Sequence, residues 1–228
     1  MTDKPSLSII VPVLNEAATI VASLEALAPL RTRGAEAVVV DGGSIDGTAA
    51  LAKPLADSVV TSARGRATQM NAGAAIARGI VLLFLHADTR LPQDADRLIS
   101  DGLLQSGGAW GRFDVSIESR HLLLRIVARS MNWRSRLTGI ATGDQAMFIT
   151  RQAFEKVGGF REIALMEDIE LSRRLKRISR PFCLRARVRT SGRRWEKRGV
   201  LRTILLMWRL RAAYFFGAPP EELARRYG

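Results

Sequence analysis

Short apolar runs alternate with longer segments of helical composition through the first ninety residues of the chain. The apolar runs have the length of buried strands and occupy residues 7–13, 37–40, 59–61 and 80–85. Helices are predicted between them. The first covers residues 17–30, the second begins at a cap at Ser44 or Asp46 and ends at residue 56, and the third covers residues 67–78. This alternation predicts right-handed β-α-β units and an α/β fold with a mainly parallel central sheet covered on both faces.

The pattern becomes less regular after residue 110. Strands are predicted at residues 110–117 and 146–149, and helices at residues 121–133, 151–156 and 167–178. No internal repeat, low-complexity tract or flexible linker divides the chain. We therefore expect one compact domain over residues 1–198, followed by a basic helical extension over residues 199–228.

The net charge of +13 is concentrated near the C-terminus. Residues 1–170 carry 18 basic and 19 acidic side chains, whereas residues 171–228 carry 17 basic and 3 acidic ones. Such a basic end can meet phosphates, a nucleic-acid backbone or an anionic membrane surface. Because no helix-turn-helix, zinc or RNA-binding signature accompanies the charge, a specific nucleic-acid partner is not expected.

The N-terminal residues and the cysteine content indicate a reducing compartment. Residues 1–5 are not followed by the long apolar stretch of a secretory signal, and Cys183 is the only cysteine, which excludes an intrachain disulfide. We expect a cytoplasmic protein, located at the inner face of the membrane if the basic extension binds lipid.

Polar side chains follow three of the predicted strands. Asn15 and Glu16, Asp41, and the segment 86–88 each lie just past a strand end, where open α/β sheets bind their ligands. A carboxylate there, such as Asp88, can hold Mg²⁺ or Mn²⁺ against a diphosphate, since these cations accept phosphate oxygens and water as further ligands. The competing interpretation is that Asp88 only caps a turn before Pro92.

Three further groups have both a functional and a structural interpretation. Arg66 can face phosphates or solvent, and Glu167 and Asp168 can cap a helix start or serve in catalysis. Asp168 is our candidate for the general base that deprotonates an acceptor hydroxyl. Arg194 can contact a diphosphate and Trp195 a sugar or the acceptor, or both can belong to a basic surface segment.

Taken in order, these motifs resemble the family 2 glycosyltransferases of the GT-A fold. The matching segments are residues 11–16, 41–48, 87–88, 143–147, 158–160 and 167–171. Arg66 with residues 69–73 and 86–89 is similar to the subgroup called radical-SAM/selenodomain-associated transferase 2. The resemblance implies a Rossmann-like GT-A domain with a nucleotide-binding half up to about residue 110 and an acceptor-binding half over residues 111–198.

The resemblance also implies roles for individual residues. Pro12, Glu16 and Asp41 would surround the nucleoside, Asp88 would bind metal and diphosphate, and Asp168 would be the catalytic base of an inverting displacement. The remaining candidate substrate-binding residues are Asn15, Arg66, Asn71, Asp144, Glu167, Arg194 and Trp195. Where the family usually has Asp-x-Asp, this chain has His86-Ala87-Asp88, so His86 joins Asp88 as a candidate ligand for Mg²⁺ or Mn²⁺.

These expectations define a reaction and its alternatives. The resemblance implies transfer from a nucleoside-diphosphate sugar, with UDP- and GDP-sugars favoured, to an unidentified acceptor that can be lipid-linked. Transfer of a single sugar is favoured because the glutamine of the Gln-x-x-Arg-Trp signature of processive relatives is missing at Ser191. A nucleotidyltransferase is disfavoured by the lack of a glycine-rich, lysine-containing loop after the first strand. A non-catalytic nucleotide- or nucleic-acid-binding protein is the remaining alternative.

The segment 200–216 is apolar but interrupted by three arginines, and it is too short to span a bilayer. A helix there would bring together Leu201, Ile204, Leu205, Trp208 and Phe215, with the basic residues on another side. This apolar stripe can lie on an anionic membrane or, more plainly, pack on the catalytic domain or on a second subunit.

Overall fold

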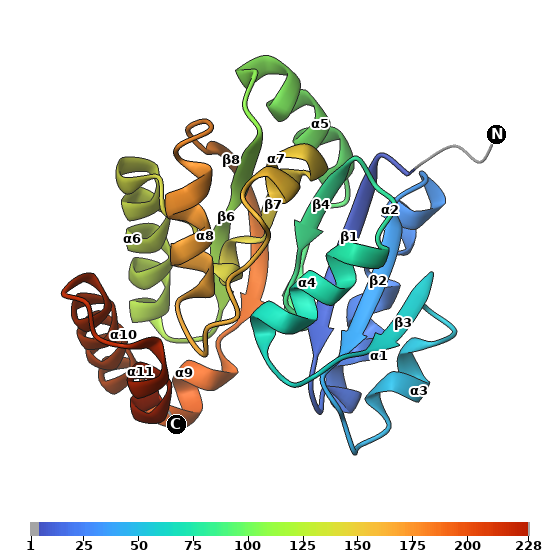
Figure 1. The fold of residues 1–228 in the computed structure, drawn as a ribbon. Helices are drawn as coiled ribbons and strands as arrows, with labels where there is room; N and C mark the ends of the chain where they lie inside the picture. Colours follow the sequence, from blue (N-terminus) through green and yellow to red (C-terminus); the bar gives the residue numbers. More distant parts are fainter. Residues whose placement is uncertain (1–4, 228) are drawn as a thin grey trace.

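An eight-stranded sheet forms the centre of the computed structural model, which describes residues 5–227 (Figure 1). The side chains of Arg194, Lys197 and Arg198 also lie outside the described part. The strands are β1 (Leu7–Val13), β2 (Glu36–Asp41), β3 (Ser58–Thr61), β4 (Val81–Phe84), β5 (Thr89–Arg90), β6 (Trp110–Glu118), β7 (Met147–Thr150) and β8 (Phe182–Ser191). Their order across the sheet is β3-β2-β1-β4-β7-β6-β8-β5.

The direction of the strands divides the sheet into two parts. The first four strands, β1 to β4, are parallel, as the alternation of strands and helices predicts. β7 is antiparallel to both of its neighbours, β6 and β8 are parallel, and β5 pairs antiparallel with β8. The α/β fold class is confirmed, and the second half of the chain makes the sheet mixed.

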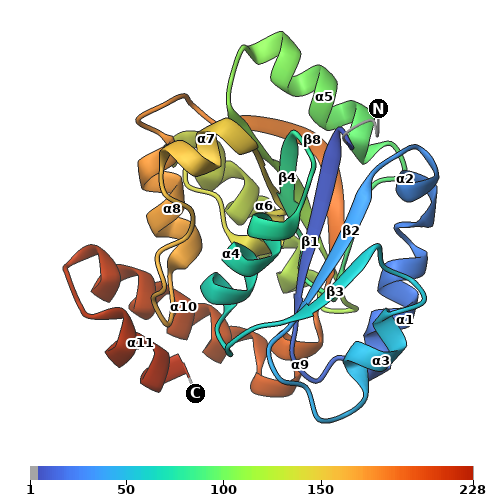
Figure 2. The same ribbon diagram turned by 45° about the vertical axis from the view of Figure 1, so that its right-hand side comes forward.

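Helices cover both faces of the sheet (Figures 1 and 2). One face is packed against α1 (Ala17–Glu25), α2 (Ala28–Thr32), α3 (Thr48–Ala52), α5 (Ala95–Ser106) and α6 (Leu122–Thr138). The other face carries α4 (Arg66–Ile76), α7 (Arg151–Lys156) and α8 (Glu167–Leu175). The three C-terminal helices are α9 (Arg193–Arg198), α10 (Val200–Phe215) and α11 (Pro220–Tyr227).

The central strands are buried on both sides because their alternate residues enter two separate cores. In β1, Ile9 contributes to the core under α1 and α2, whereas Ile10 contributes to the core under α4. Both side chains are fully buried, as expected for strands whose two faces are each covered by helices. This double burial explains why these strands read as continuous apolar runs in the sequence.

Side chains of the loop after β2 accept hydrogen bonds from N–H groups at the start of α1, so the loop does more than cap α3. The Ala17 N–H donates to Asp46 at 3.0 Å, the Glu16 N–H to the Thr48 hydroxyl at 2.8 Å, and the Asn15 N–H to the Ser44 hydroxyl at 2.8 Å. Helix α3 begins after Gly47 and ends at Ala52, so the predicted helix through residue 56 is too long. The helix ends early because Pro54 directly follows the C-cap residue Lys53 and has no N–H to donate the next intrahelical hydrogen bond.

The C-terminal helices attach to α8 through a small apolar core. Leu210 of α10 and Leu223 of α11 are buried against Met166 and Ile169. Of the alternatives for the apolar stripe, packing on the catalytic domain is not observed: Leu201, Leu205, Trp208 and Phe215 are 60–72% exposed, because α10 turns its opposite side inward. Among residues 5–227, no helix is long and apolar enough to cross a membrane.

Gly111 of β6 is the position where we expect a single methyl group to disturb the sheet most clearly. A Cβ atom there would lie 2.3 Å from the Phe182 carbonyl oxygen and 2.4 Å from the Phe148 ring. We expect Gly111→Ala to lower the free energy of unfolding by about 1–3 kcal/mol, because neither neighbour can move without disturbing the core. Thermal unfolding measures this, with Gly108→Ala as the control, because the atom closest to its new methyl group would be a rotatable serine hydroxyl at 3.1 Å. Equal stability of the two variants would contradict the packing described here.

Candidate active site

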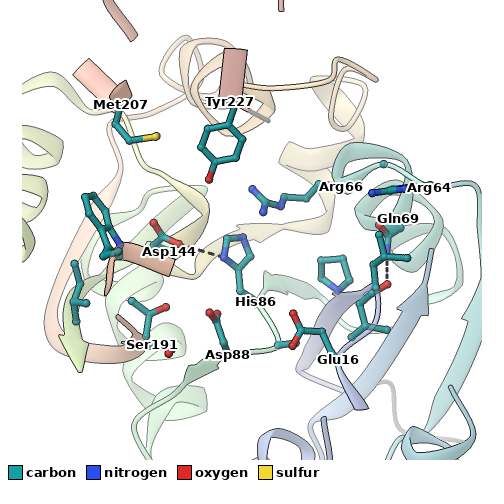
Figure 3. A pocket seen from close by; sticks show the side chains of 18 of the residues that line it. Glu16, Arg64, Arg66, Gln69, His86, Asp88, Asp144, Ser191, Met207 and Tyr227 are labelled. Atoms are coloured by element: carbon teal, nitrogen blue, oxygen red, sulfur yellow. Dashed lines mark hydrogen bonds and ion pairs between the residues drawn. The ribbon is translucent and has the colours of Figure 1, made fainter. Parts of the chain in front are cut away.

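A cavity of about 370 Å³ opens at the carboxyl ends of β1 and β4 (Figure 3). Val13 at the end of β1 is in register with Asp41 at the end of β2, and β4 pairs with the other side of β1. The polar residues that follow these strands are therefore brought to one edge of the sheet. Glu16 and Asp88 both face the cavity from this edge.

His86 lies at the centre of the cavity. The turn before β7 contacts its imidazole ring. Its Nδ1 atom is 3.3 Å from the Asp144 carboxylate. Gly143 is in contact with the opposite edge of the ring, since a Cβ at this position would lie 2.5 Å from Nε2. The imidazole is thus fixed between two consecutive residues of the 3-10 turn Gly143–Gln145.

Arg66, at the first position of α4, points into the same cavity (Figure 3). Its guanidinium is 3.6 Å from the carboxylate of Glu167. Burial by the cavity walls opposes the charge on Arg66, but Glu167, Asp144 and Asp168 outweigh it and raise the pKa of the guanidinium. Although walled in, the side chain remains 42% exposed to solvent in the cavity, so a ligand can reach it.

Glu167 and Asp168 begin α8 and line a smaller hollow that adjoins the main cavity. Burial and the neighbouring Asp168 carboxylate raise the pKa of Glu167, while Arg66 opposes the increase. The two oxygens of Asp168 accept hydrogen bonds from the Gly143 N–H at 2.9 Å and from the Ile169 N–H at 2.7 Å. Asp168 therefore has a fixed orientation, and the bond to Gly143 connects it to the turn that holds His86.

The structure brings most of the candidate residues together. The residues that line the cavity are Pro12, Glu16, Arg66, His86, Asp88, Asp144 and Trp195, with Glu167 and Asp168 in the adjoining hollow. Asn15, Asp41 and Asn71 lie outside the lining. Asp41 accepts hydrogen bonds from the N–H groups of Gly43 and Ser44, and the Asn71 amide is bonded to both the N–H and the carbonyl of Phe160. The side chain of Arg194 is outside the described part.

Several lining residues were not among the candidates taken from the sequence. Thr203 and Met207 of α10 and Tyr227 of α11 complete one wall, and Thr190 and Ser191 of β8 form another. The Tyr227 hydroxyl points toward Arg66, His86 and Asp144 (Figure 3). The spacing of Leu223 and Tyr227 on one side of α11 indicates an inward face, but only the packing of α11 on α8 shows where it points.

The donor groups of the cavity suit a divalent cation that completes its coordination with ligand oxygens. Within residues 5–227, no three His, Cys, Asp or Glu side chains are grouped closely enough to hold a metal without further ligands. Asp88 offers a carboxylate to the cavity, and Mg²⁺ and Mn²⁺ are commonly bound by one or two carboxylates together with phosphate oxygens and water. The residues present therefore fit such a cation only together with a phosphate-bearing ligand.

Comparison with known proteins shows the family of the chain. The model of "Glycosyl transferase family 2" matches residues 8–158, which include Asp88 and Asp144 but end before Asp168. A Bacillus subtilis protein named "Probable glycosyltransferase YdaM" is 28% identical over 202 residues, covering 77% of this chain and 47% of that protein. The chain thus spans less than half the length of this relative.

Solved structures agree with the family match. The mannosyltransferase PcManGT from Pyrobaculum calidifontis, in complex with GDP-Man and Mn²⁺, is 25% identical, with a TM-score of 0.62 and coverage of 93% of this chain and 62% of that one. TarS 1-349 from S. aureus in complex with UDP-GlcNAc is 18% identical, with a TM-score of 0.69 and coverage of 82% and 58%, and this likeness concerns the fold. On the family match and this common fold, the chain belongs to glycosyl transferase family 2.

Proposed function

We propose that the chain is a metal-dependent, inverting glycosyltransferase that moves one sugar from a UDP- or GDP-sugar to an acceptor hydroxyl. The observation that carries this proposal is the juxtaposition of Asp88 and Arg66 in one cavity with Asp168 in the adjoining hollow. A family 2 fold supplies the context, and PcManGT, which binds GDP-Man and Mn²⁺, supports a nucleoside-diphosphate sugar as the donor.

In this proposal the carboxyl edge of the sheet binds the donor. Pro12 and Glu16 line the part of the cavity that would receive the nucleoside, and Asp41 supports it from the end of β2. Asp88 would hold Mg²⁺ or Mn²⁺, which neutralises the charge that develops on the leaving diphosphate. Arg66 faces the same space and would add charge-assisted hydrogen bonds to the phosphates. His86, fixed against Asp144, is the second candidate ligand.

Asp168 would act on the acceptor. The acceptor hydroxyl oxygen attacks the anomeric carbon, its proton passes to the Asp168 carboxylate, and the bond from that carbon to the diphosphate breaks with its electron pair on the diphosphate oxygen. A single displacement of this kind inverts the anomeric configuration. The two N–H groups that bind Asp168 keep the carboxylate in place for this proton transfer.

The subgroup, the bounds of the catalytic domain and the role of Trp195 are further parts of this proposal. Arg66 with the segments 69–73 and 86–89 supports membership of the radical-SAM/selenodomain-associated transferase 2 subgroup. We take residues 1–198 as the catalytic domain, with an extension over residues 199–228 that contributes Met207 and Tyr227 to the wall of its cavity. Trp195 lines the cavity and is placed to contact the sugar or the acceptor.

Calorimetric titration of UDP, GDP and TDP into the protein, with and without Mn²⁺, tests the proposal. We expect one of UDP and GDP to bind most tightly, and we expect Mn²⁺ to increase its affinity, because a cation held by Asp88 would neutralise charge on the diphosphate. Incubation with the matching nucleoside triphosphate and a sugar phosphate should release no pyrophosphate. Pyrophosphate release would favour a nucleotidyltransferase, and affinity independent of the metal would contradict the proposed donor site.

A further inference from the structure

Two arginines beside the candidate base have guanidinium nitrogens without partners. Arg134 lies on α6 and Arg211 on α10. The Nε and Nη2 atoms of Arg134 and the Nε atom of Arg211 are buried and have no hydrogen-bond partner among the described residues. Buried polar atoms in folded proteins are almost always hydrogen-bonded, so three such atoms on neighbouring cations require an explanation.

The two cations lie close together and next to Asp168. Arg211 lines the hollow that also contains Asp168. Burial and the charge of Arg211 lower the pKa of Arg134 to about 10, while Asp168 opposes the decrease. Arg134 therefore remains positively charged at neutral pH, although it is desolvated and faces a like charge.

Arg112 shows how this chain satisfies a buried arginine when the role is structural. Its side chain is 0% exposed, and its guanidinium donates to Asp114, to the Ser135 hydroxyl and to the Asn132 carbonyl. By contrast, the Nε and Nη2 atoms of Arg134 and the Nε atom of Arg211 have no acceptor among the described residues. Since buried guanidinium nitrogens without acceptors are costly, the arrangement is best explained by an anion that binds between the two arginines.

We propose that Arg134 and Arg211 bind a phosphate group of the acceptor substrate, beside Asp168. This inference rests on the glycosyltransferase function proposed above. Two guanidinium groups suit a phosphate, whose oxygens accept bidentate hydrogen bonds. The acceptor is favoured over the donor because Arg211 lies in the hollow of Asp168 and outside the lining of the main cavity. The phosphate is a recognition group, and the attacking atom remains the hydroxyl oxygen near Asp168.

The surface around the pair favours a phosphate attached to an apolar chain. On α10, Arg211 is three residues from Trp208 and four from Phe215, and on α6 Arg134 is three residues from Leu137. These three apolar side chains are 65–72% exposed. Exposed aromatic and aliphatic groups that border a cationic site match an amphiphile whose charged head enters the site. The acceptor is therefore expected to be a lipid phosphate that also carries a hydroxyl.

Binding of decyl phosphate, a lipid phosphate mimic, tests the site directly. Calorimetry would compare the wild-type protein with Arg134→Met and Arg211→Met, using Arg129→Met and Arg209→Met as controls because these arginines are exposed on the same helices. We expect each test variant to lose about 10-fold or more in affinity for decyl phosphate, as for a lost charge-assisted hydrogen bond, while the control variants change less than about 2-fold. Equal affinity in all proteins, or no binding to the wild type, would overturn the site.

Further measurements separate the possible sources of the anion. UDP and GDP affinity should be unchanged in the test variants, and a parallel loss would assign the arginines to the donor instead. Decyl phosphate should bind more tightly than glycerol 3-phosphate, and equal affinity would overturn the lipid assignment. Thermal unfolding checks that the variants are folded, and Arg134→Met should not lower Tm, because it removes a charge whose buried nitrogens have no acceptor. Arg211→Lys is a second control, because it keeps a positive charge. Failure of the wild type to bind any nucleotide would count against the proposed function, not against this anion site.

Discussion

Replacing Asp168 with asparagine is expected to reduce kcat for sugar transfer by about 100- to 10,000-fold, the range typical of a lost general base. Asparagine is nearly isosteric, and its side-chain oxygen can still accept the Gly143 N–H bond seen at 2.9 Å. The bond to the turn that holds His86 should therefore remain, while the bond from the Ile169 N–H and the ability to take a proton are lost. Measurement of kcat together with nucleotide affinity checks this, because UDP or GDP binding should change little.

Glu167→Gln is the matched control for Asp168→Asn, because the two acids are adjacent and both line the hollow beside the cavity. Glu167 is 3.6 Å from Arg66, so its replacement should act mainly on donor binding through that arginine. We expect a smaller decrease in kcat than for Asp168→Asn. If Glu167→Gln abolished transfer and Asp168→Asn retained most of it, the two assignments would have to be exchanged.

Replacing Asp88 with alanine is expected to remove the effect of Mn²⁺ on nucleotide binding. A divalent cation supplies several kcal/mol of charge stabilisation to a diphosphate, so the affinity in Mn²⁺ should decrease by about 100-fold or more. Without metal, wild type and variant should bind nucleotide almost equally, because the contacts of Pro12 and Glu16 do not depend on Asp88. Calorimetric titrations with and without Mn²⁺ measure both quantities.

Asp101→Ala is the control for this second prediction, since Asp101 is an exposed carboxylate on α5. It should leave both titrations unchanged, which shows that the loss does not follow from removing any negative charge. A metal effect that persists in Asp88→Ala would shift the assignment toward His86 and Asp144, which are 3.3 Å apart in the same cavity.

The sequence by itself determined the parallel half of the sheet and the edge at which the cavity opens. Ile9 and Ile10 enter opposite cores, so β1 is apolar on both faces apart from Ser8, and such a run is recognisable without knowledge of its partners. The polar residues past β1 and β4 then fall at one edge, because parallel strands bring their carboxyl ends together. Local periodicity and strand direction carry this information along the chain itself.

Tertiary structure decided the features that depend on distant partners. The strand β8 alternates arginines with half-buried or buried residues, and its place beside β6 follows from pairing with a strand about 70 residues away. Asn71 is a candidate substrate-binding residue by its motif, and the fold shows its amide bonded to the backbone of Phe160, a distant partner. Helices α10 and α11 reach the cavity because Leu210 and Leu223 find their apolar partners on α8. Sequence patterns record which face of an element is buried, whereas only packing specifies the element against which it is buried.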